Sequence, residues 1–569
     1  MDAARADHDG ERESRVPLGL GGAGRMKKKA TLLPSGVERL EGFSLLLLLL
    51  PVLVFLFVSI RTLYLFPVAD SYRWYGDETW MLLAWRNLIA HGQMAVPVAL
   101  GSTLQSSPGL LLGSGWVAAL FYGVPQILFD ASTDPILIGR TISFLFGVAT
   151  IAILSLSGSR LKLPAAPTLL SAVLLVTTQN FTFASHSARY DMMTGFTVLA
   201  FVGHFAVRSH ERKIHSALFA FLFGLSTALA ALTVSPHLEV LLLPLAFFIA
   251  WYFGLLVRVK NALAVAGGIL CGFGALGVLF VLTNHHFSLA GGIATDNQFG
   301  SVLSNLPVRH FLSWSAERHQ LLAKGFYLWH EAPAFAFILP LILISEAVLL
   351  GLKRPHPTTA FLSVALGCVM FSALFFQSTL PYYLVHVLPL VALTFAAHAG
   401  EWKRASLFRP AVGLISLGVA GLVMFVWLPQ LKNAGVIGKR ISQENTAAIQ
   451  AAIEEESRLW SRGTPMLILT QAPGVHELLR DTSIRLMTEA FLFFPDRVES
   501  PDTVIARLGV DYILDYNRPM TAEYQHAIRS TTPIFSRMGR LLDRTVDYYH
   551  DSTSELDTLT LYAVHKPQE

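Results

Sequence analysis

Long apolar runs dominate the chain, and they constrain its fold more than any other feature. A helix needs about 20 mainly apolar residues to cross a bilayer. Eleven runs are candidates for such helices: 43–65, 136–156, 165–183, 192–207, 216–233, 238–257, 263–282, 334–352, 359–376, 382–397 and 411–428. Charged residues make up only 14% of the 569 residues, whereas soluble domains hold about 25%. The sequence therefore predicts an α-helical polytopic membrane protein with about 11 transmembrane helices.

The positions of lysine and arginine predict the orientation of these helices, because cytoplasmic loops are enriched in both residues. A twelfth apolar segment, 108–129, decides the count. If it does not cross and the N-terminus is cytoplasmic, the basic clusters all fall on the cytoplasmic side: Arg160 and Lys162; Arg208, Arg212 and Lys213; Arg258 and Lys260; Lys353 and Arg354; Lys403, Arg404 and Arg409. The short outer turns 234–237 and 377–380 then hold no basic residue. We therefore expect 108–129 to be a juxtamembrane or re-entrant helix.

Three regions follow from this topology. Residues 1–42 are expected to form a cytoplasmic, partly disordered N-terminus. Met26, which is followed by three lysines, would make a natural translation start. Residues 1–25 would then be a disordered or mis-assigned extension. Residues 43–430 form the transmembrane domain. Its first apolar run is too long for the core of a cleavable signal peptide. Its first outer loop spans 66–135. In residues 431–569 predicted helices at 447–462, 475–480 and 503–508 alternate with predicted strands at 466–470, 484–487, 512–514 and 559–564. This alternation predicts a small α/β domain on the outer face.

Composition argues against several other classes of protein. The net charge of +4 is small and spread over short clusters, which gives no patch for nucleic acid. Cys271 and Cys368 both lie inside apolar runs, so we expect neither a disulfide nor a cysteine metal site.

Asp77 and Glu78 stand between the first apolar run and a predicted helix at 80–90. Carboxylates at the edge of a membrane are costly to hold near lipid, and they suggest a functional site by default. In the alternative interpretation, Asp77 is the N-cap of the following helix and Glu78 lies in its first turn, where the helix dipole favours negative charge. The two residues alone leave both interpretations open.

Other polar residues gather at the same predicted outer face: Arg73, Arg86, His186, Arg189, Asp191, His237, His285, His286, Arg309, Arg318, His319, Tyr382, Tyr383 and His386. Many of them have simpler explanations. Arg189 could extend to the membrane interface, Tyr382 and Tyr383 could belong to an aromatic belt, and the histidines could be solvated or at helix ends. Arg189 with Asp191 is harder to explain in this way, because two charges at the edge of a span are costly without a function.

Several short motifs on this face resemble those of membrane glycosyltransferases of the type C fold, which include protein O-mannosyltransferases and the aminoarabinose transferases that act on lipid A. The resemblance extends over roughly 40–400. It rests on Gly76-Asp77-Glu78 followed by 84–88 ("DE…A.R.L"), on 139–143 ("ARL.S"), on 187–192 ("ARPDM") and on 381–384 ("RYLLP"). Ser107 departs from the pattern, which has His or Lys there, and Val234-Ser235 departs where many relatives have Lys.

This resemblance implies an enzyme that takes a sugar from a polyprenyl-phosphate donor in the bilayer and transfers it to a glycan, lipid or protein acceptor. Asp77 would be the general base, and Glu78 would orient the acceptor or the loop. Asp191 would either bind a divalent metal ion together with Asp77 or hold Arg189. The residues implied for substrate and phosphate binding are Arg73, Arg189, His237, Tyr382, Tyr383 and His386. Whether a metal takes part is left open by the resemblance.

A transporter or flippase of a lipid-linked saccharide is the alternative function. Such a protein is expected to have repeated halves and charged or broken helices near the midplane. The predicted spans hold few charges, Glu239 and Glu346 among them, and no internal repeat is visible. We therefore favour the enzyme, and expect a multi-pass protein of a bacterial inner membrane with a cytoplasmic N-terminus and a periplasmic C-terminal domain.

Overall fold

The computed structural model describes about half of the 569 residues. The described ranges are 49–57, 97–100, 103–106, 120–123, 135–211, 216–233, 236–283, 332–351, 356–376, 381–404, 453–460, 466–470, 484–488, 510–516, 532–540 and 556–563, with the single positions 59, 117, 125, 328 and 451. The predicted span 411–428 and the predicted tail helices 475–480 and 503–508 lie outside them.

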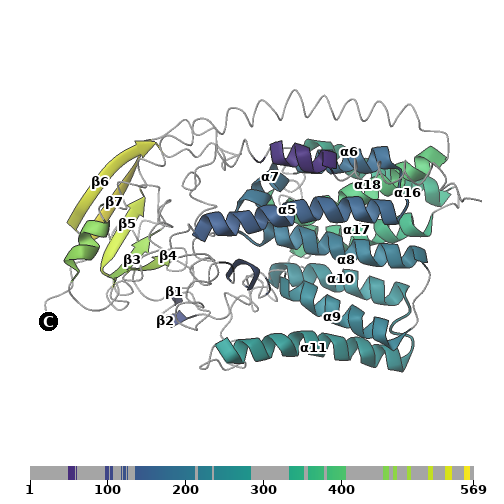
Figure 1. Ribbon diagram of the computed structural model, residues 1–569, viewed down its shortest axis with the longest axis horizontal. Helices are drawn as coiled ribbons and strands as arrows, with labels where there is room; N and C mark the ends of the chain where they lie inside the picture. The colour runs from purple at the N-terminus through teal and green to yellow at the C-terminus, as the bar shows by residue number, and fades with distance from the viewer. Residues whose placement is uncertain are drawn as a thin grey trace, which may run out of the picture. The chain divides into compact units, whose positions relative to one another are not determined.

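Long helices make up most of the described chain (Figure 1). In order they are α5 Pro135–Arg160, α6 Ala165–Val176, α7 Gln179–His186, α8 Asp191–Glu211, α9 Ala217–Thr233, α10 Pro236–Tyr252, α11 Val259–Thr283, α16 Pro333–Gly351, α17 Pro357–Phe376, the 3-10 helix η1 Pro381–His386, and α18 Leu388–Arg404. Helix α8 packs against α5, and α9 packs against α10 and α11. The predicted runs from 192 to 282 and from 334 to 376 correspond to these helices within a few residues.

Two of the described helices are long and apolar enough to cross a membrane by themselves, Ile138–Arg160 and Ala334–Gly351. The pair Asn180–His186 and Asp191–Ser209 passes the same test together, with a bend of 114° between its two parts. Shorter apolar helices accompany them, including Ala217–Ala231 and Pro357–Phe371. These helices are those of a multi-pass α-helical membrane protein.

The expected span at 165–183 is not one continuous helix, because two helices occupy this stretch. Helix α6 ends at Val176 and α7 begins at Gln179. The hydroxyls of Thr177 and Thr178 donate to the carbonyls of Leu174 and Leu175, at 2.9 and 2.8 Å. Thr178 Oγ1 also accepts from the backbone N–H of Phe181 at 3.3 Å, which caps α7. Two threonines thus bond groups at both helix ends within an apolar run.

Helices α9 and α11 approach each other closely because glycines line their contact. A Cβ added at Gly224 would lie 2.1 Å from the carbonyl oxygen of Val265, and one at Gly268 would lie 2.1 Å from that of Phe221. At Gly272 an added Cβ would lie 2.5 Å from the Cβ of Ala228. Small residues four apart allow this backbone-to-backbone packing of membrane helices.

A buried polar network joins α16, α17 and α18. His398 Nδ1 lies 2.8 Å from Ser345 Oγ, and its Nε2 lies 2.9 Å from Ser363 Oγ. Ser363 Oγ donates to Glu346 Oε2 at 2.8 Å, and Trp402 Nε1 donates to Ser345 Oγ at 2.6 Å. Hydrogen bonds between side chains of neighbouring helices stabilise packing in an apolar surrounding. The carboxylate of Glu346, unusual in a predicted span, is therefore part of a helix-to-helix contact.

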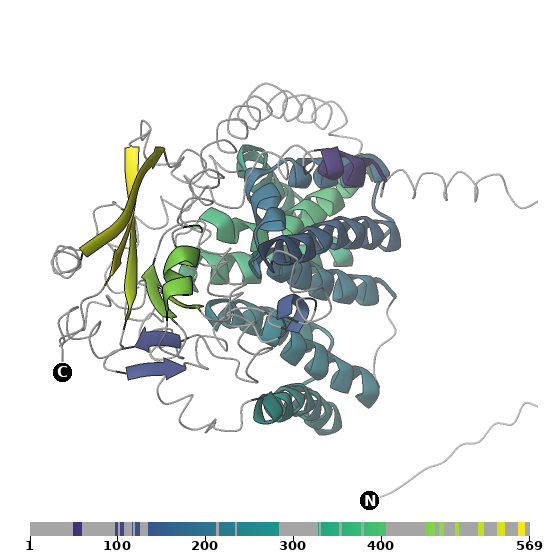
Figure 2. The same cartoon turned by 60° about the vertical axis from the view of Figure 1, so that its left-hand side comes forward.

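The described strands form two separate sheets. Strands β1 Pro97–Leu100 and β2 Thr103–Ser106 pair as an antiparallel hairpin. Five others form a mixed sheet in the order β4-β3-β5-β7-β6: β3 Met466–Thr470, β4 Ile484–Thr488, β5 Tyr512–Tyr516, β6 Thr532–Arg540 and β7 Leu556–Ala563. Strand β3 is parallel to β4 and β5, whereas β7 is antiparallel to β5 and β6. Figure 2 shows the long antiparallel strands in yellow.

Four of these five strands lie at the predicted positions, and β6 was not predicted. The residues 453–459 are helical, within the predicted helix 447–462. Tyr512 on β5 donates a hydrogen bond to Glu456 Oε2 at 2.8 Å, which ties this helix to the sheet.

Candidate functional site

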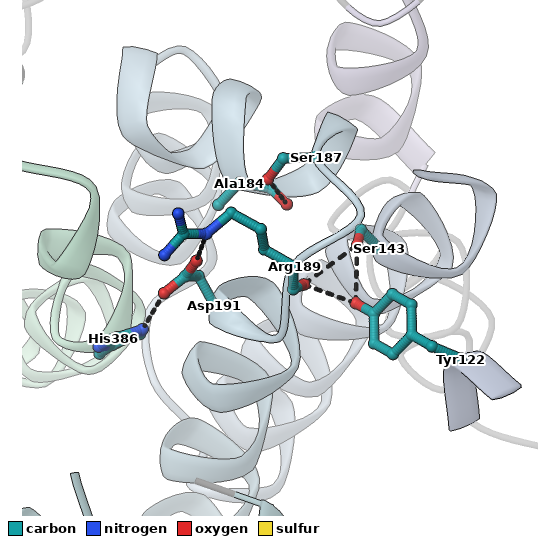
Figure 3. Close-up of polar contacts among 7 residues, drawn as sticks. All are labelled: Tyr122, Ser143, Ala184, Ser187, Arg189, Asp191 and His386. Carbon is teal, nitrogen blue, oxygen red and sulfur yellow. Dashed lines mark hydrogen bonds and ion pairs between the residues drawn. The ribbon is translucent and has the colours of Figure 1, made fainter. Parts of the chain in front are cut away.

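A buried ion pair lies where the chain turns from α7 into α8. Arg189 Nε donates to Asp191 Oδ2 at 2.7 Å, and each side chain is only 2% exposed (Figure 3). Asp191 is the first residue of α8. The N–H groups of a first helical turn carry partial positive charge, which stabilises a carboxylate there. The sequence Arg189-Tyr190-Asp191 therefore builds the pair locally, from a turn residue and a helix start.

His386 completes the cluster from a distant part of the chain. It is the last residue of η1, is fully buried, and its Nε2 lies 3.0 Å from Asp191 Oδ1. An ionised carboxylate can only accept hydrogen bonds, so Nε2 must carry the hydrogen in this contact. Asp191 thus lies between two nitrogen donors, one on each oxygen. We call Arg189, Asp191 and His386 the Asp191 cluster.

Gly195 allows η1 to lie directly on α8 beside this cluster. A Cβ added at Gly195 would lie 2.6 Å from the carbonyl oxygen of Val385, the residue before His386. Gly195 follows Asp191 by four residues, so both lie on the same face of α8. The absence of a side chain at Gly195 therefore brings the backbone next to His386 within reach of Asp191.

Gly195→Ala is expected to weaken the Asp191 cluster. The new methyl group would meet a backbone oxygen, and such overpacking costs about 1–3 kcal/mol. Thermal unfolding of the purified protein in detergent should show the loss. Gly367→Ala in α17 is the control, because a Cβ there meets nothing within 4 Å and alanine favours a helix by about 1 kcal/mol over glycine. Equal unfolding temperatures for the two variants would contradict the close approach.

Two hydroxyl groups hold the backbone of the turn. Tyr122 Oη donates to the carbonyl oxygen of Arg189 at 2.8 Å, and Ser143 Oγ donates to the same oxygen at 3.3 Å. The two hydroxyl oxygens are 2.7 Å apart (Figure 3). Tyr122 and Ser143 are both fully buried. The main chain of Arg189 is thus fixed from α5 and from the segment 120–123, in addition to the ion pair of its side chain.

The other predicted site residues are placed as follows. Arg73, Asp77 and Glu78 lie outside the described residues. His237 is the second residue of α10, and Tyr382 and Tyr383 belong to η1, the element that ends at His386. Of the six residues predicted to bind substrate or phosphate, the structure brings Arg189 and His386 together.

The predicted metal site has only one member in the described part of the chain, Asp191. Both of its oxygens are bonded, to Arg189 and to His386. Within the described ranges no group of three or more His, Cys, Asp or Glu residues could hold a metal ion. A metal site shared by Asp77 and Asp191 remains a prediction, because Asp77 lies outside the described residues.

Three contributors to the site were not predicted: Tyr122, Ser143 and Gly195. Ser143 stands in the motif 139–143 that carried the family resemblance, and Tyr122 lies in the apolar segment 108–129. The motif could therefore have pointed to Ser143. The hydroxyl of Tyr122 and the missing side chain of Gly195 contribute to the site only through tertiary contacts, which the sequence does not show.

Comparison with known proteins identifies the fold. No protein-family model matches the chain, and no curated protein matches its sequence. Among solved structures, ArnT from Cupriavidus metallidurans in the apo state has a TM-score of 0.51 and 14% identity, over 91% of this chain and 98% of that chain. The structure of ArnT bound to undecaprenyl phosphate has the same TM-score and identity, over 90% and 97%. The chain therefore has the fold of ArnT, a type C glycosyltransferase fold, which confirms the resemblance of the motifs at the level of the fold.

Proposed function

We propose that the chain is a glycosyltransferase that moves a sugar from a polyprenyl-phosphate donor to an acceptor hydroxyl. The observation that carries the proposal is the buried Asp191 cluster, at the start of α8 in a chain with the fold of ArnT. A buried ion pair within apolar helices is costly to maintain and suggests a function. The structure of ArnT with undecaprenyl phosphate supports a lipid phosphate as the ligand.

Arg189 is suited to bind the phosphate because Asp191 fixes its guanidinium. A guanidinium is a rigid plane with five N–H donors, and pairs of them bind phosphate oxygens in a bidentate way. Asp191 accepts from Nε, which sets the direction of the plane without using the terminal nitrogens in that bond. Asp191 also fixes His386 from its other oxygen. In this proposal Asp191 positions both donors and does not itself contact the substrate.

The transfer follows from these roles. The acceptor oxygen attacks the anomeric carbon of the sugar, and the bond from that carbon to the phosphate oxygen breaks. The electron pair of the broken bond stays on the leaving lipid phosphate, where Arg189 and His386 stabilise the added charge. The proton of the acceptor hydroxyl passes to a carboxylate base, for which Asp77 is the candidate. The site would face the periplasm of a bacterial inner membrane, an orientation supported by the distribution of Lys and Arg.

Asp77→Asn tests this function directly. Removing a general base lowers the rate by about 10²–10⁴-fold, whereas asparagine keeps the shape and the capping ability of aspartate. Purified protein in lipid should transfer labelled sugar from a polyprenyl-phosphate donor pool, and the variant should not. Glu78→Gln is the comparison variant. It removes the neighbouring charge and leaves the base, so transfer should fall less than in Asp77→Asn, by the loss of an orienting role alone.

Two other outcomes would change the interpretation. If wild type and Asp77→Asn transfer sugar equally, Asp77 is a helix cap and the base lies elsewhere. If neither transfers sugar but labelled lipid-linked saccharide crosses the bilayer, the protein is a transporter and the proposed enzyme is wrong.

A further inference from the structure

Tyr122 connects a separate segment of the chain to the turn that carries Arg189. It belongs to the helical residues 120–123, within the predicted first outer loop. Its side chain is fully buried, and its hydroxyl donates to the carbonyl oxygen of Arg189 at 2.8 Å. Tyr122 and Arg189 are 67 positions apart in sequence. The contact is therefore tertiary, and it reaches the backbone of one residue of the Asp191 cluster.

A second contact seats the same segment on the helices. The rings of Phe121 and Phe146 meet edge to face with their centroids 5.4 Å apart, and Phe146 lies 5.5 Å from Phe196 on α8. Ser143 and Phe146 are three residues apart on α5, so they share one face of that helix. Adjacent residues 121 and 122 thus contact adjacent turns of α5, one by an aromatic ring and one by a hydroxyl.

These contacts fix the main chain of Arg189 at both of its polar groups. The backbone N–H of Arg189 donates to the carbonyl of Ser187 at 2.7 Å, and its own carbonyl accepts from Tyr122 and Ser143. The turn between α7 and α8, bent by 114°, cannot supply the regular bonds of a continuous helix. With both groups held, the direction in which the side chain of Arg189 leaves the backbone is set as well.

We propose that Tyr122 is a positioning residue for lipid-phosphate binding, and that it acts through the backbone of Arg189. The inference rests on the proposed function, since it assigns the phosphate to Arg189. It adds that the segment 120–123 helps to determine the affinity for the donor without contacting it. The same loop, 66–135, carries Asp77 in the sequence, so one loop would supply the base and orient the group that holds the leaving phosphate.

The test uses Tyr122→Phe, which removes one hydroxyl and keeps the ring. Full-length protein in detergent is titrated with undecaprenyl phosphate, and the KM for the donor and kcat are measured in the transfer assay. A lost buried hydrogen bond costs enough to weaken binding by about tenfold. We expect the Kd for undecaprenyl phosphate to rise by this factor and kcat/KM for the donor to fall by at least as much, because Arg189 also stabilises the charge that develops on the leaving phosphate. Tyr512→Phe is the matched control. It removes a hydroxyl from strand β5 that bonds Glu456 on the neighbouring helix, and it should leave the Kd for undecaprenyl phosphate unchanged.

A double-mutant cycle separates positioning from a general loss of structure. In an Arg189→Gln background the cation that binds the phosphate is gone, so Tyr122→Phe should no longer change the affinity for undecaprenyl phosphate. If Tyr122→Phe lowers the affinity equally in both backgrounds, or binds the lipid as well as wild type does, the inference is wrong and the proposed function stands. If the wild-type protein does not bind undecaprenyl phosphate, the proposed function fails, and the inference fails with it.

Discussion

Asp191→Asn is expected to lower the free energy of unfolding by about 3–5 kcal/mol, which is the usual cost of removing one partner from a buried ion pair. Arg189 is 2% exposed in the structure, so its charge would lose the carboxylate at 2.7 Å in a place that water does not reach. The hydrogen bond from His386 would lose its charged acceptor as well. Sugar transfer should fall by at least about a hundredfold, since small displacements of groups that hold a substrate have effects of this size.

Thermal unfolding in detergent and the transfer assay together check this prediction. Asp511→Asn is the matched control, because Asp511 is a buried carboxylate outside the Asp191 cluster that accepts from the backbone N–H of Leu467 at 2.9 Å, and asparagine keeps an oxygen that can accept this bond. The double variant Asp191→Asn/Arg189→Gln should regain part of the stability and none of the transfer. Unchanged stability and full transfer for Asp191→Asn would show that the ion pair has neither role.

Gly268→Ala is expected to destabilise the helical region by about 1–3 kcal/mol through overpacking. The added Cβ would lie 2.1 Å from the carbonyl oxygen of Phe221, and a backbone atom cannot turn away as a side chain can. Helix α11 would have to move away from α9. A larger residue such as leucine at the same position should increase the effect.

The adjacent residue provides the control for this prediction. A Cβ at Gly267 meets only the ring of Phe221 at 3.9 Å, an ordinary contact. Gly267→Ala should therefore leave stability unchanged or raise it by up to about 1 kcal/mol, because alanine is the better helix former. The two variants differ by one position, and only Gly268→Ala should lower the unfolding temperature in detergent. The same sign for both would contradict the close packing of α9 on α11.

Most of the helical fold could be predicted from hydrophobicity, because most of the described long helices correspond to one continuous apolar run each. The break between α6 and α7 could not. Thr177 and Thr178 bond carbonyls three residues back in the chain, and threonine is also common within membrane helices. The close glycine contacts were missed for a related reason. Glycine is frequent in such helices, and the sequence does not show which glycines meet a neighbouring backbone.

The Asp191 cluster was predictable only in part. Arg189 and Asp191 are two residues apart at a predicted helix start, so their contact is local. His386 appeared among the candidates, but its bond to Asp191 spans 195 positions and depends on how η1 packs on α8. The predicted base Asp77 remains a prediction, because it lies outside the described residues.

The polar network of α16, α17 and α18 bears on the position of His386. His398 on α18 is anchored to Ser345 and Ser363 on the two neighbouring helices. From Leu388, the first residue of α18, to His398 the helix rises about 15 Å, and His386 stands just before this helix. Helix α18 is also packed against α5, α6 and α8, and the part of it next to His386 is buried, with Leu388 1% and Leu390 0% exposed. The position of His386 opposite Asp191 therefore depends also on helices that contribute no residue to the Asp191 cluster, and a substitution at Ser345 or Ser363 should reach the cluster through α18.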